Sequence, residues 1–252
     1  RGSCARVSHR PILPPDTPVR ARSHHVHRDC TVRPQAGTGG TSCRTAGMLL
    51  RAPSSPALAV LVLPGGTDSS YKPFSPLQGS AMRMYPFSAS IRARYGSAVA
   101  VRDVRYRVYG WNGEQNSPML YARKALDDIT ARHPGIPVAL IGHSMGGRVG
   151  ARLAAHHSVG SLLALAPWWQ FADWRHIHDD VRVVAVHGTA DTRTYARRTE
   201  KGVAELSARG VDATYVPIPG GGHPMLDHIL TWQGEALRFV GRSLEEARAL
   251  AR

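Results

Sequence analysis

Cysteine is nearly absent from this chain of 252 residues, and its three copies, Cys4, Cys30 and Cys43, all fall near the start. The chain after residue 43 therefore has no disulfide framework, no cysteine nucleophile and no thiolate ligand for zinc. A group of histidines within residues 24–27 lies close to Cys30, but this spacing matches no zinc pattern. We expect a disordered basic segment there, and no metal or organic cofactor anywhere in the chain.

Lysine is also scarce, since only Lys72, Lys124 and Lys201 are lysines among 32 basic residues. The formal net charge of +14 would by itself suggest a nucleic-acid or anionic-membrane partner. The charge is spread along the chain, however, and no nucleic-acid recognition motif accompanies it. We expect no nucleic-acid partner; binding that falls steeply with added salt would indicate the alternative.

Long hydrophobic runs are missing as well. No window approaches the ~18 consecutive apolar residues that a transmembrane helix requires. The run "ALAVLVL" (57–63) could be mistaken for a short signal peptide, but it leads directly into a glycine turn, which favours a buried strand. We therefore expect a cytoplasmic protein with no membrane partner, and the oligomeric state stays open.

Residues 1–47 differ from the rest of the chain. They show no hydrophobic period, are rich in proline, glycine and arginine, and precede Met48, where ordered patterning begins. We expect residues 1–47 to be a disordered leader, tag-derived or otherwise non-native, with a natural disordered tail as the alternative. Residues 48–252 are expected to form a single domain.

Short apolar runs alternate with longer helical patterns from Met48 onward. This alternation predicts an α/β fold, with a mostly parallel, doubly wound sheet of about six strands and helices on both faces. Ser117 is the expected N-cap of the second helix. The predicted strands are 57–63, 97–110, 136–142, 161–168, 181–188 and 212–222, and the predicted helices are 79–96, 117–135, 145–157, 194–210 and 225–251.

The stretch "GHSMGG" (142–147) joins the predicted strand 136–142 to the predicted helix 145–157. Gly142, Ser144 and Gly146 form the pattern G-x-S-x-G, which is typical of a nucleophile elbow. In such a turn the serine occupies a strained conformation near the positive end of the helix, so its flanking residues must be small. We interpret Ser144 as a nucleophile; the alternative is a small residue in a tight turn.

Four ordered segments, "VLPGG", "IGHSMGG", "VHGTADTRT" and "GGGHPML", together resemble the α/β-hydrolase superfamily, as a serine esterase-like protein with a short lid. The resemblance extends from about Ala57 to the end of the chain. It implies a catalytic triad in the order serine, acid, histidine, with the acid after a late strand and the histidine after the last strand.

Asp191 and His223 occupy the implied acid and histidine positions. Asp191 would hold the imidazole of His223 in the correct tautomer, and His223 would transfer protons to and from Ser144. Three other acids could be considered, but they precede the strand 181–188 and are therefore expected at the edge of the sheet away from Ser144: Asp173, Asp179 and Asp180. Among the other histidines, His143 and His187 are expected to be packing residues, and His228 falls in a helical pattern.

Acyl transfer also requires hydrogen-bond donors for the developing oxyanion. The resemblance implies the backbone N–H of Met145 and that of Gly66 in the first glycine turn, with Thr67 as the second choice. The superfamily usually has His-Gly before this donor, whereas this chain has Pro-Gly. The aromatic segment "APWWQFADW" (166–174) provides Trp168 and Trp169 as expected pocket-wall residues, together with Thr67 and its neighbours on the other side.

These residues predict a serine hydrolase that cleaves small or medium carboxylic esters through an acyl-enzyme, with a small-molecule ester or thioester as substrate. Thioester hydrolysis, amide hydrolysis and acyl transfer use the same machinery and stay open. A catalytically silent ligand-binding protein of the same fold is a further alternative, although such a protein would be expected to lose Ser144, Asp191 or His223.

Overall fold

The structure is a computed structural model, and it describes residues 55–252, which lie in one compact unit. The leader expected at residues 1–47 and the group of histidines near Cys30 lie outside the described residues. Within residues 55–252, none of the helices has the length and apolar character needed to cross a membrane.

Strands and helices alternate along the described chain, as the hydrophobic pattern predicts. The strands are β1 (Leu58–Leu63), β2 (Val99–Asp103), β3 (Val138–His143), β4 (Val159–Leu165), β5 (Arg182–Gly188) and β6 (Ala213–Ile218). The helices are α1 (Gly79–Met82), α2 (Tyr85–Tyr95), α3 (Ser117–Arg132), α4 (Met145–Leu153), α5 (Ala196–Ala208) and α6 (Ile229–Leu250). Short 3-10 turns occupy η1 (Gly96–Ala98), η2 (Gly113–Gln115) and η3 (Asp173–His176).

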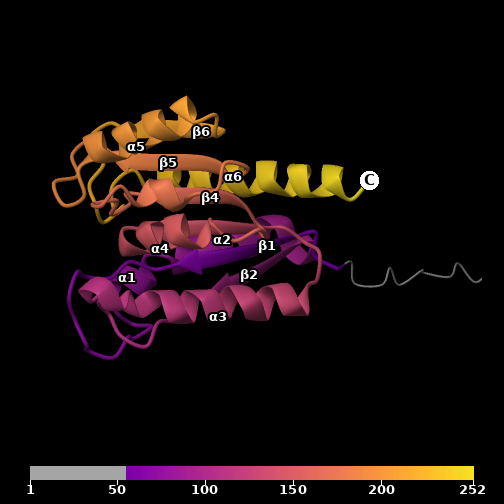
Figure 1. Cartoon of the computed structure of the whole chain (residues 1–252), viewed down its shortest axis with the longest axis horizontal. Coiled ribbons are helices and arrows are strands. Elements are labelled where there is room, and N and C mark those ends of the chain that lie inside the picture. Colours follow the sequence, from indigo (N-terminus) through magenta and orange to yellow (C-terminus); the bar gives the residue numbers. More distant parts are fainter. Residues whose placement is uncertain (1–54) are drawn as a thin grey trace, which may run out of the picture. The chain divides into compact units, whose positions relative to one another are not determined.

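The six strands form one sheet in the order β2-β1-β3-β4-β5-β6, and every neighbouring pair is parallel (Figure 1). From β1 the chain first adds β2 on one side and then returns to add β3 on the other side. The strand order therefore reverses between β1 and β3. In open parallel sheets such a reversal leaves a crevice at the carboxyl ends of the strands, which is the usual place for a ligand.

Alternate residues of the strands β1, β3, β4, β5 and β6 enter two separate hydrophobic clusters, one on each face of the sheet, whereas β2 at the edge contributes to one cluster only. In β1, for example, Leu61 packs into the cluster that includes α3, α4 and α5, whereas Val60 packs into the cluster that includes α2 and α6. Burying both faces explains why the strands are almost continuously apolar. The predicted fold class, a parallel doubly wound sheet with helices on both faces, is confirmed.

The second strand is shorter than the pattern predicts. It ends at Asp103, because its partner β1 ends at Leu63 and the following residues have no strand to pair with. Residues 104–110 instead run along the loop that follows β1, where Phe74 N–H donates to Arg107 O and Tyr109 N–H donates to Lys72 O. This pairing fixes the loop after β1 beside the carboxyl edge of the sheet.

Several helix bounds also differ from the prediction: the helix predicted over 79–96 is divided into α1 and α2, and α6 begins at Ile229 rather than residue 225. The helix α3 begins at Ser117 itself, and the preceding Asn116 has left-handed backbone angles. The Ser117 hydroxyl accepts a hydrogen bond from Asn112 Nδ2, so it does not cap the helix. The helix α4 stops at Leu153 rather than residue 157, because the chain must turn there to enter β4.

Candidate active site

Ser144 lies in a sharp turn between β3 and α4, with φ 55° and ψ −116°. Positive φ is strained for a residue with a side chain, and this turn is held by close backbone packing. A Cβ on Gly142 would approach Gly146 O to 2.3 Å, and one on Gly146 would approach Leu63 O to 2.1 Å. The two glycines of the G-x-S-x-G pattern are thus required by backbone contacts on either side of the serine.

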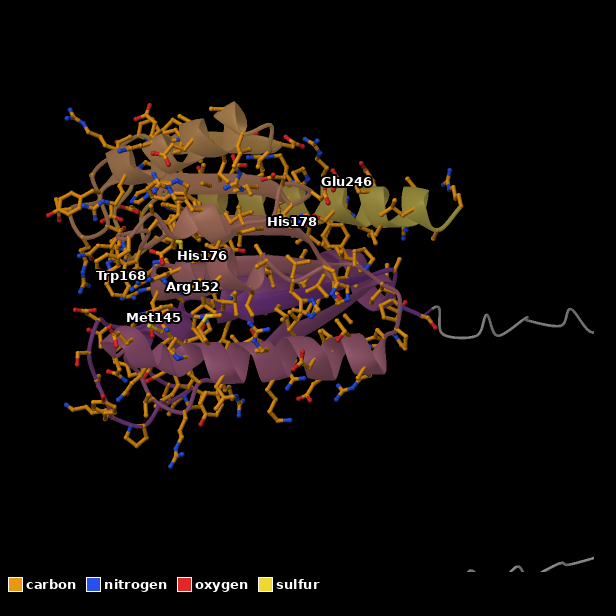
Figure 2. The ribbon with its side chains drawn as sticks, in the orientation of Figure 1. Met145, Arg152, Trp168, His176, His178 and Glu246 are labelled. Carbon is orange, nitrogen blue, oxygen red and sulfur yellow. The ribbon has the colours of Figure 1, made fainter. Side chains whose placement is uncertain are left out.

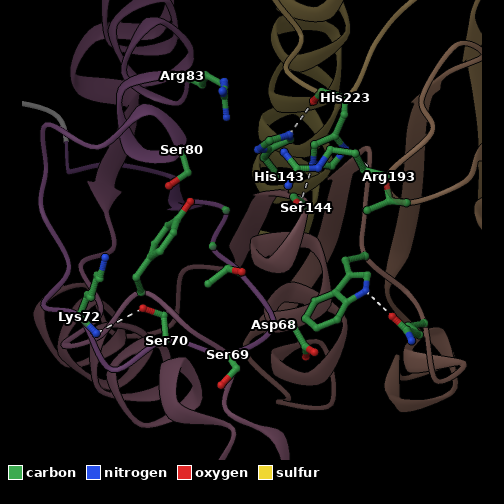
Figure 3. A pocket seen from close by; sticks show the side chains of 17 residues that line it. Asp68, Ser69, Ser70, Lys72, Ser80, Arg83, His143, Ser144, Arg193 and His223 are labelled. Atoms are coloured by element: carbon green, nitrogen blue, oxygen red, sulfur yellow. Dashed lines mark hydrogen bonds between the residues drawn. The ribbon is translucent and has the colours of Figure 1, made fainter.

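The side chains of Ser144, His223 and Asp191 form a continuous hydrogen-bonded chain. Ser144 Oγ lies 3.0 Å from His223 Nε2, and Figure 3 shows these two side chains facing each other. His223 Nδ1 lies 2.8 Å from Asp191 Oδ2. His223 follows β6 through a glycine loop, and Asp191 follows β5, so residues far apart in the sequence meet at one edge of the sheet. All three predicted triad positions are therefore brought together.

Asp191 accepts hydrogen bonds at both carboxylate oxygens. Its Oδ1 accepts from the backbone N–H groups of Arg193 and Thr194, at 2.7 and 3.2 Å. Its Oδ2 accepts from the Thr194 hydroxyl at 2.7 Å and from His187 Nε2 at 3.0 Å, in addition to His223. Burial alone would raise the pKa of Asp191, but the hydrogen bonds from His187, His223 and Thr194 outweigh it and keep this pKa well below its usual value.

His187 and Thr194 are functional candidates that the sequence reasoning did not identify. His187 is completely buried, and its Nδ1 lies 2.8 Å from the Thr199 hydroxyl while Nε2 faces Asp191. This arrangement places a proton on Nε2, since a carboxylate can only accept. The sequence signal is the short spacing from His187 and Thr194 to Asp191, whereas His187 is predicted as a packing residue and Thr194 as the first residue of a helix that in the structure begins at Ala196.

His143 also contacts the triad rather than only packing in the core. Its Nε2–H donates to the backbone carbonyl of His223 at 3.0 Å. His143, which directly precedes Ser144, therefore fixes the backbone of the loop that carries His223. Burial, together with the nearby His223, lowers the pKa of His143 to about 3. Its Nδ1 has no hydrogen-bond partner within residues 55–252. The ring is therefore neutral at ordinary pH.

The rival residues lie elsewhere. Asp173 is buried against Arg148, with its Oδ1 2.9 Å from Arg148 Nε. Asp179 and Asp180 are exposed, and Asp179 pairs with Arg209. His228 is exposed before α6 and makes none of the recorded contacts with the triad.

The glycine turn after β1 lies directly against the Ser144 turn. A Cβ on Gly66 would collide with the Met145 side chain and with Tyr109 O, both at 2.4 Å, so only glycine fits. Thr67 N–H, the second-choice donor, donates to Tyr109 O at 3.2 Å. For the N–H groups of Gly66 and Met145, no hydrogen-bond partner is found in the described part of the chain. Two unpaired donors thus come from segments that pack beside Ser144.

A cavity of about 720 Å³ lies over Ser144, and its lining is mostly polar. Thr67 and Trp168 line it, together with the loop after β1, Gly66 and His223. Figure 2 places Trp168 and Met145 at one end of the fold and Glu246 toward the other. The cavity therefore occupies the crevice expected where the strand order reverses.

Trp169, expected in the pocket wall, lies instead in the core. Its side chain is completely buried, its Nε1 donates to Gly147 O at 3.1 Å, and it packs against Trp174. The two tryptophans follow β4, where the chain has left the strand, and they point in different directions. Trp168 alone reaches it, with its Nε1 donating to Gln170 at 2.7 Å.

Comparison with known proteins finds similarity in structure but not in sequence. No family model matches the chain, and no curated protein matches it. Among solved structures, it is similar to XC6422 from Xanthomonas campestris, an α/β serine hydrolase without a lid. The identity is 18% and the TM-score 0.59, over 75% of this chain and 83% of that one.

Two further structures show the same likeness. MGS-M1, an α/β hydrolase from a deep-sea metagenome library of the Medee basin, is 19% identical with a TM-score of 0.58, covering 77% of this chain and 86% of that chain. Est1E from Butyrivibrio proteoclasticus is 13% identical with a TM-score of 0.54, covering 77% and 90% of the two chains. The arrangement of strands and helices in residues 55–252 is that of the α/β-hydrolase fold.

Proposed function

We propose that this protein is a serine hydrolase that cleaves small or medium carboxylic esters through an acyl-enzyme intermediate. The observation that carries the proposal is the hydrogen-bonded chain from Ser144 Oγ through His223 to Asp191, at 3.0 and 2.8 Å, opening onto a cavity. Solved structures of the same fold that are named as serine hydrolases are consistent with it.

In the first half of the reaction, Ser144 Oγ attacks the ester carbonyl carbon while His223 Nε2 takes its proton. The backbone N–H groups of Met145 and Gly66 stabilise the negative charge that develops on the carbonyl oxygen. In such sites, one donor lowers the activation free energy by roughly 3–4 kcal/mol. The ester C–O bond then breaks as His223 returns the proton to the leaving alcohol oxygen, and the acyl group stays on Ser144. Asp191 acts as a positioning residue that fixes the imidazole tautomer and stabilises the imidazolium.

In the second half, water enters the polar cavity and loses a proton to His223 as it attacks the acyl carbon on Ser144. Collapse of this intermediate breaks the acyl bond, and the proton on His223 returns to Ser144 Oγ. The segment 166–181 between β4 and β5 contains only the short turn η3, so a long-chain pocket under a lid is not part of the proposal.

Labelling with a fluorophosphonate probe tests this function directly. We expect the wild type to be labelled and to hydrolyse 4-nitrophenyl acetate and butyrate, while Ser144→Ala and His223→Ala give no labelling. His228→Ala is the matched histidine control and should behave as the wild type, because His228 is exposed. A folded wild type that is neither labelled nor active would overturn the proposal and favour a silent ligand-binding protein.

A further inference from the structure

The cavity over Ser144 carries an excess of positive charge. Lys72, Arg83 and Arg193 line it, and Asp68 is the single acidic residue among its lining residues. In Figure 3 the three cations come from separate segments that surround the cavity. None of the three forms an ion pair within the described residues. A cavity with this charge favours an anionic ligand over a neutral one.

Arg83 differs from the other arginines that are withdrawn from water. Half-buried and buried arginines of the described chain otherwise have a partner: the pairs are Arg102 with Asp128, Arg148 and Arg152 with Asp173, Arg182 with Glu246, and Arg198 over the Tyr195 ring. Arg83 is half-buried and has no such partner in residues 55–252. A partly desolvated guanidinium without a counter-ion is unfavourable, and a carboxylate would relieve that cost.

The position of Arg83 connects it to the reacting centre. It follows α1 directly, it lines the cavity with Ser144, and its charge acts on the buried ring of His143 beside that serine. Arg83 also lines a second, apolar cavity of about 340 Å³ together with Phe87 and Leu226. A cation between a polar and an apolar cavity can bind one end of a substrate whose remainder is aliphatic.

We infer that the substrates of this protein are esters that also carry a carboxylate, and that Arg83 binds that carboxylate. The inference rests on the proposed hydrolase function and names its substrate class. A singly charged carboxylate fits better than a phosphate, because Arg83 is the half-buried cation while Lys72 and Arg193 are exposed and Asp68 lies nearby. The exposed cations add long-range attraction that salt screens.

Matched substrate pairs provide the test. The acyl-side pair is mono(4-nitrophenyl) adipate and its methyl-capped diester, and the alcohol-side pair is 4-acetoxybenzoate and its methyl ester. For each pair, kcat/KM is measured for the charged and the neutral member after subtraction of spontaneous hydrolysis. We expect one pair to favour the charged member about tenfold in the wild type, as for a charge-assisted hydrogen bond.

The variant Arg83→Gln should reduce this charged-to-neutral ratio about tenfold, mainly through KM, and Arg83→Lys should restore part of it. Arg248→Gln removes an equal charge from α6, outside the residues that line the cavity, and should leave the ratio unchanged. Adipate should also compete with hydrolysis of the neutral ester more strongly than inorganic phosphate does.

A ratio near one in both pairs, or a ratio that Arg83→Gln does not change, would overturn the inference while ester hydrolysis itself stands. Stronger competition by phosphate would likewise reject a carboxylate as the bound anion. Absence of hydrolysis for all four esters, with no fluorophosphonate labelling, would instead reject the proposed function on which the inference rests. The two failures are therefore distinguishable.

Discussion

Asp173 and Asp191 are both carboxylates with completely buried side chains, but their partners differ in kind. Asp173 pairs with two permanent cations, Arg148 and Arg152, at 2.9 and 3.3 Å. Asp191 is surrounded by groups that can be neutral: two histidines, a hydroxyl and two backbone N–H groups. The first carboxylate is neutralised by fixed charge, and the second is stabilised by hydrogen bonds alone.

The difference indicates which carboxylate can take part in proton transfer. A charge already paired with two arginines gains little when a neighbouring imidazole becomes protonated. A carboxylate held by neutral donors can stabilise a positive charge that appears beside it, as the proposed mechanism requires of Asp191. Asp173 also organises a stack in which the Arg148 guanidinium lies 3.9 Å from the Trp111 ring, which is a structural arrangement.

The largest expected effect comes from Asp191→Asn. We expect kcat for a 4-nitrophenyl ester to fall about 10³- to 10⁴-fold, because the amide disfavours the correct tautomer of His223. The variant should stay folded, since the substitution leaves no unpaired arginine behind. Steady-state kinetics and urea unfolding measure the two effects. A loss of activity below tenfold would mean that Asp191 is not the positioning acid.

The variant Asp173→Asn should show the opposite pattern. It leaves the buried Arg148 without its counter-ion, so the free energy of unfolding should fall by about 3–5 kcal/mol. Activity per folded molecule, counted by fluorophosphonate labelling, should remain close to that of the wild type because Asp173 does not line the cavity. Asp179→Asn, at an exposed ion pair with Arg209, is the control and should cost less than about 1 kcal/mol. Equal stability of the two variants would contradict the comparison.

The smallest expected effect concerns His143, the buried histidine that donates to the backbone carbonyl of His223 in the Asp191 region. The pKa of His143 is about 3 in the folded protein and about 6.5 when unfolded, so the unfolded chain binds more protons between these values. The free energy of unfolding therefore has its full value, as far as His143 is concerned, above about pH 6.5, and it decreases as the pH falls toward 3. At pH 5 the loss should be about 2 kcal/mol.

Urea unfolding at pH 8 and pH 5 measures this loss, with His143→Gln as the comparison. Glutamine can still donate to His223 O but does not titrate, so this variant should lose about 2 kcal/mol less than the wild type between the two pH values. Its stability at pH 8 reports any packing defect separately. Identical pH dependence in the two proteins would show that His143 is not the group responsible.

Much of the fold is readable from local patterns because a parallel sheet buried on both faces needs continuous apolar strands. The short apolar run around Val60 and Leu61 predicts a strand because a Pro-Gly-Gly turn follows it directly. The hydrophobic pattern does not predict where β2 ends, because β2 can extend only as far as its partner β1, which ends at Leu63. Nor does it predict that Asn112 engages the Ser117 hydroxyl, since these residues meet only after the loop folds.

The candidate site divides in the same way. The turn at Ser144 is predictable because the residues of its G-x-S-x-G pattern are neighbours in the sequence, even though Gly146 is required by a contact with Leu63 O in β1. The contacts that His143 and His187 make with His223 and Asp191 are not predictable from the sequence, because tertiary packing decides which partner the Nε2 atom of each ring meets. Trp168 and Trp169 look equivalent in the sequence, but the direction of the chain after β4 sends one to the cavity and the other to the core.

The sequence by itself determined the alternation of strands and helices and the glycine-flanked turn at Ser144, because these depend on residue spacing, and its resemblance to the α/β-hydrolase superfamily indicated Asp191 and His223. Only the tertiary structure decided which groups converge. It brought His223 within 3.0 Å of Ser144, and left Arg83 half-buried over the same cavity without a counter-ion within the described residues. Those contacts join segments far apart in the chain, and their geometry follows from the packing of helices on the sheet.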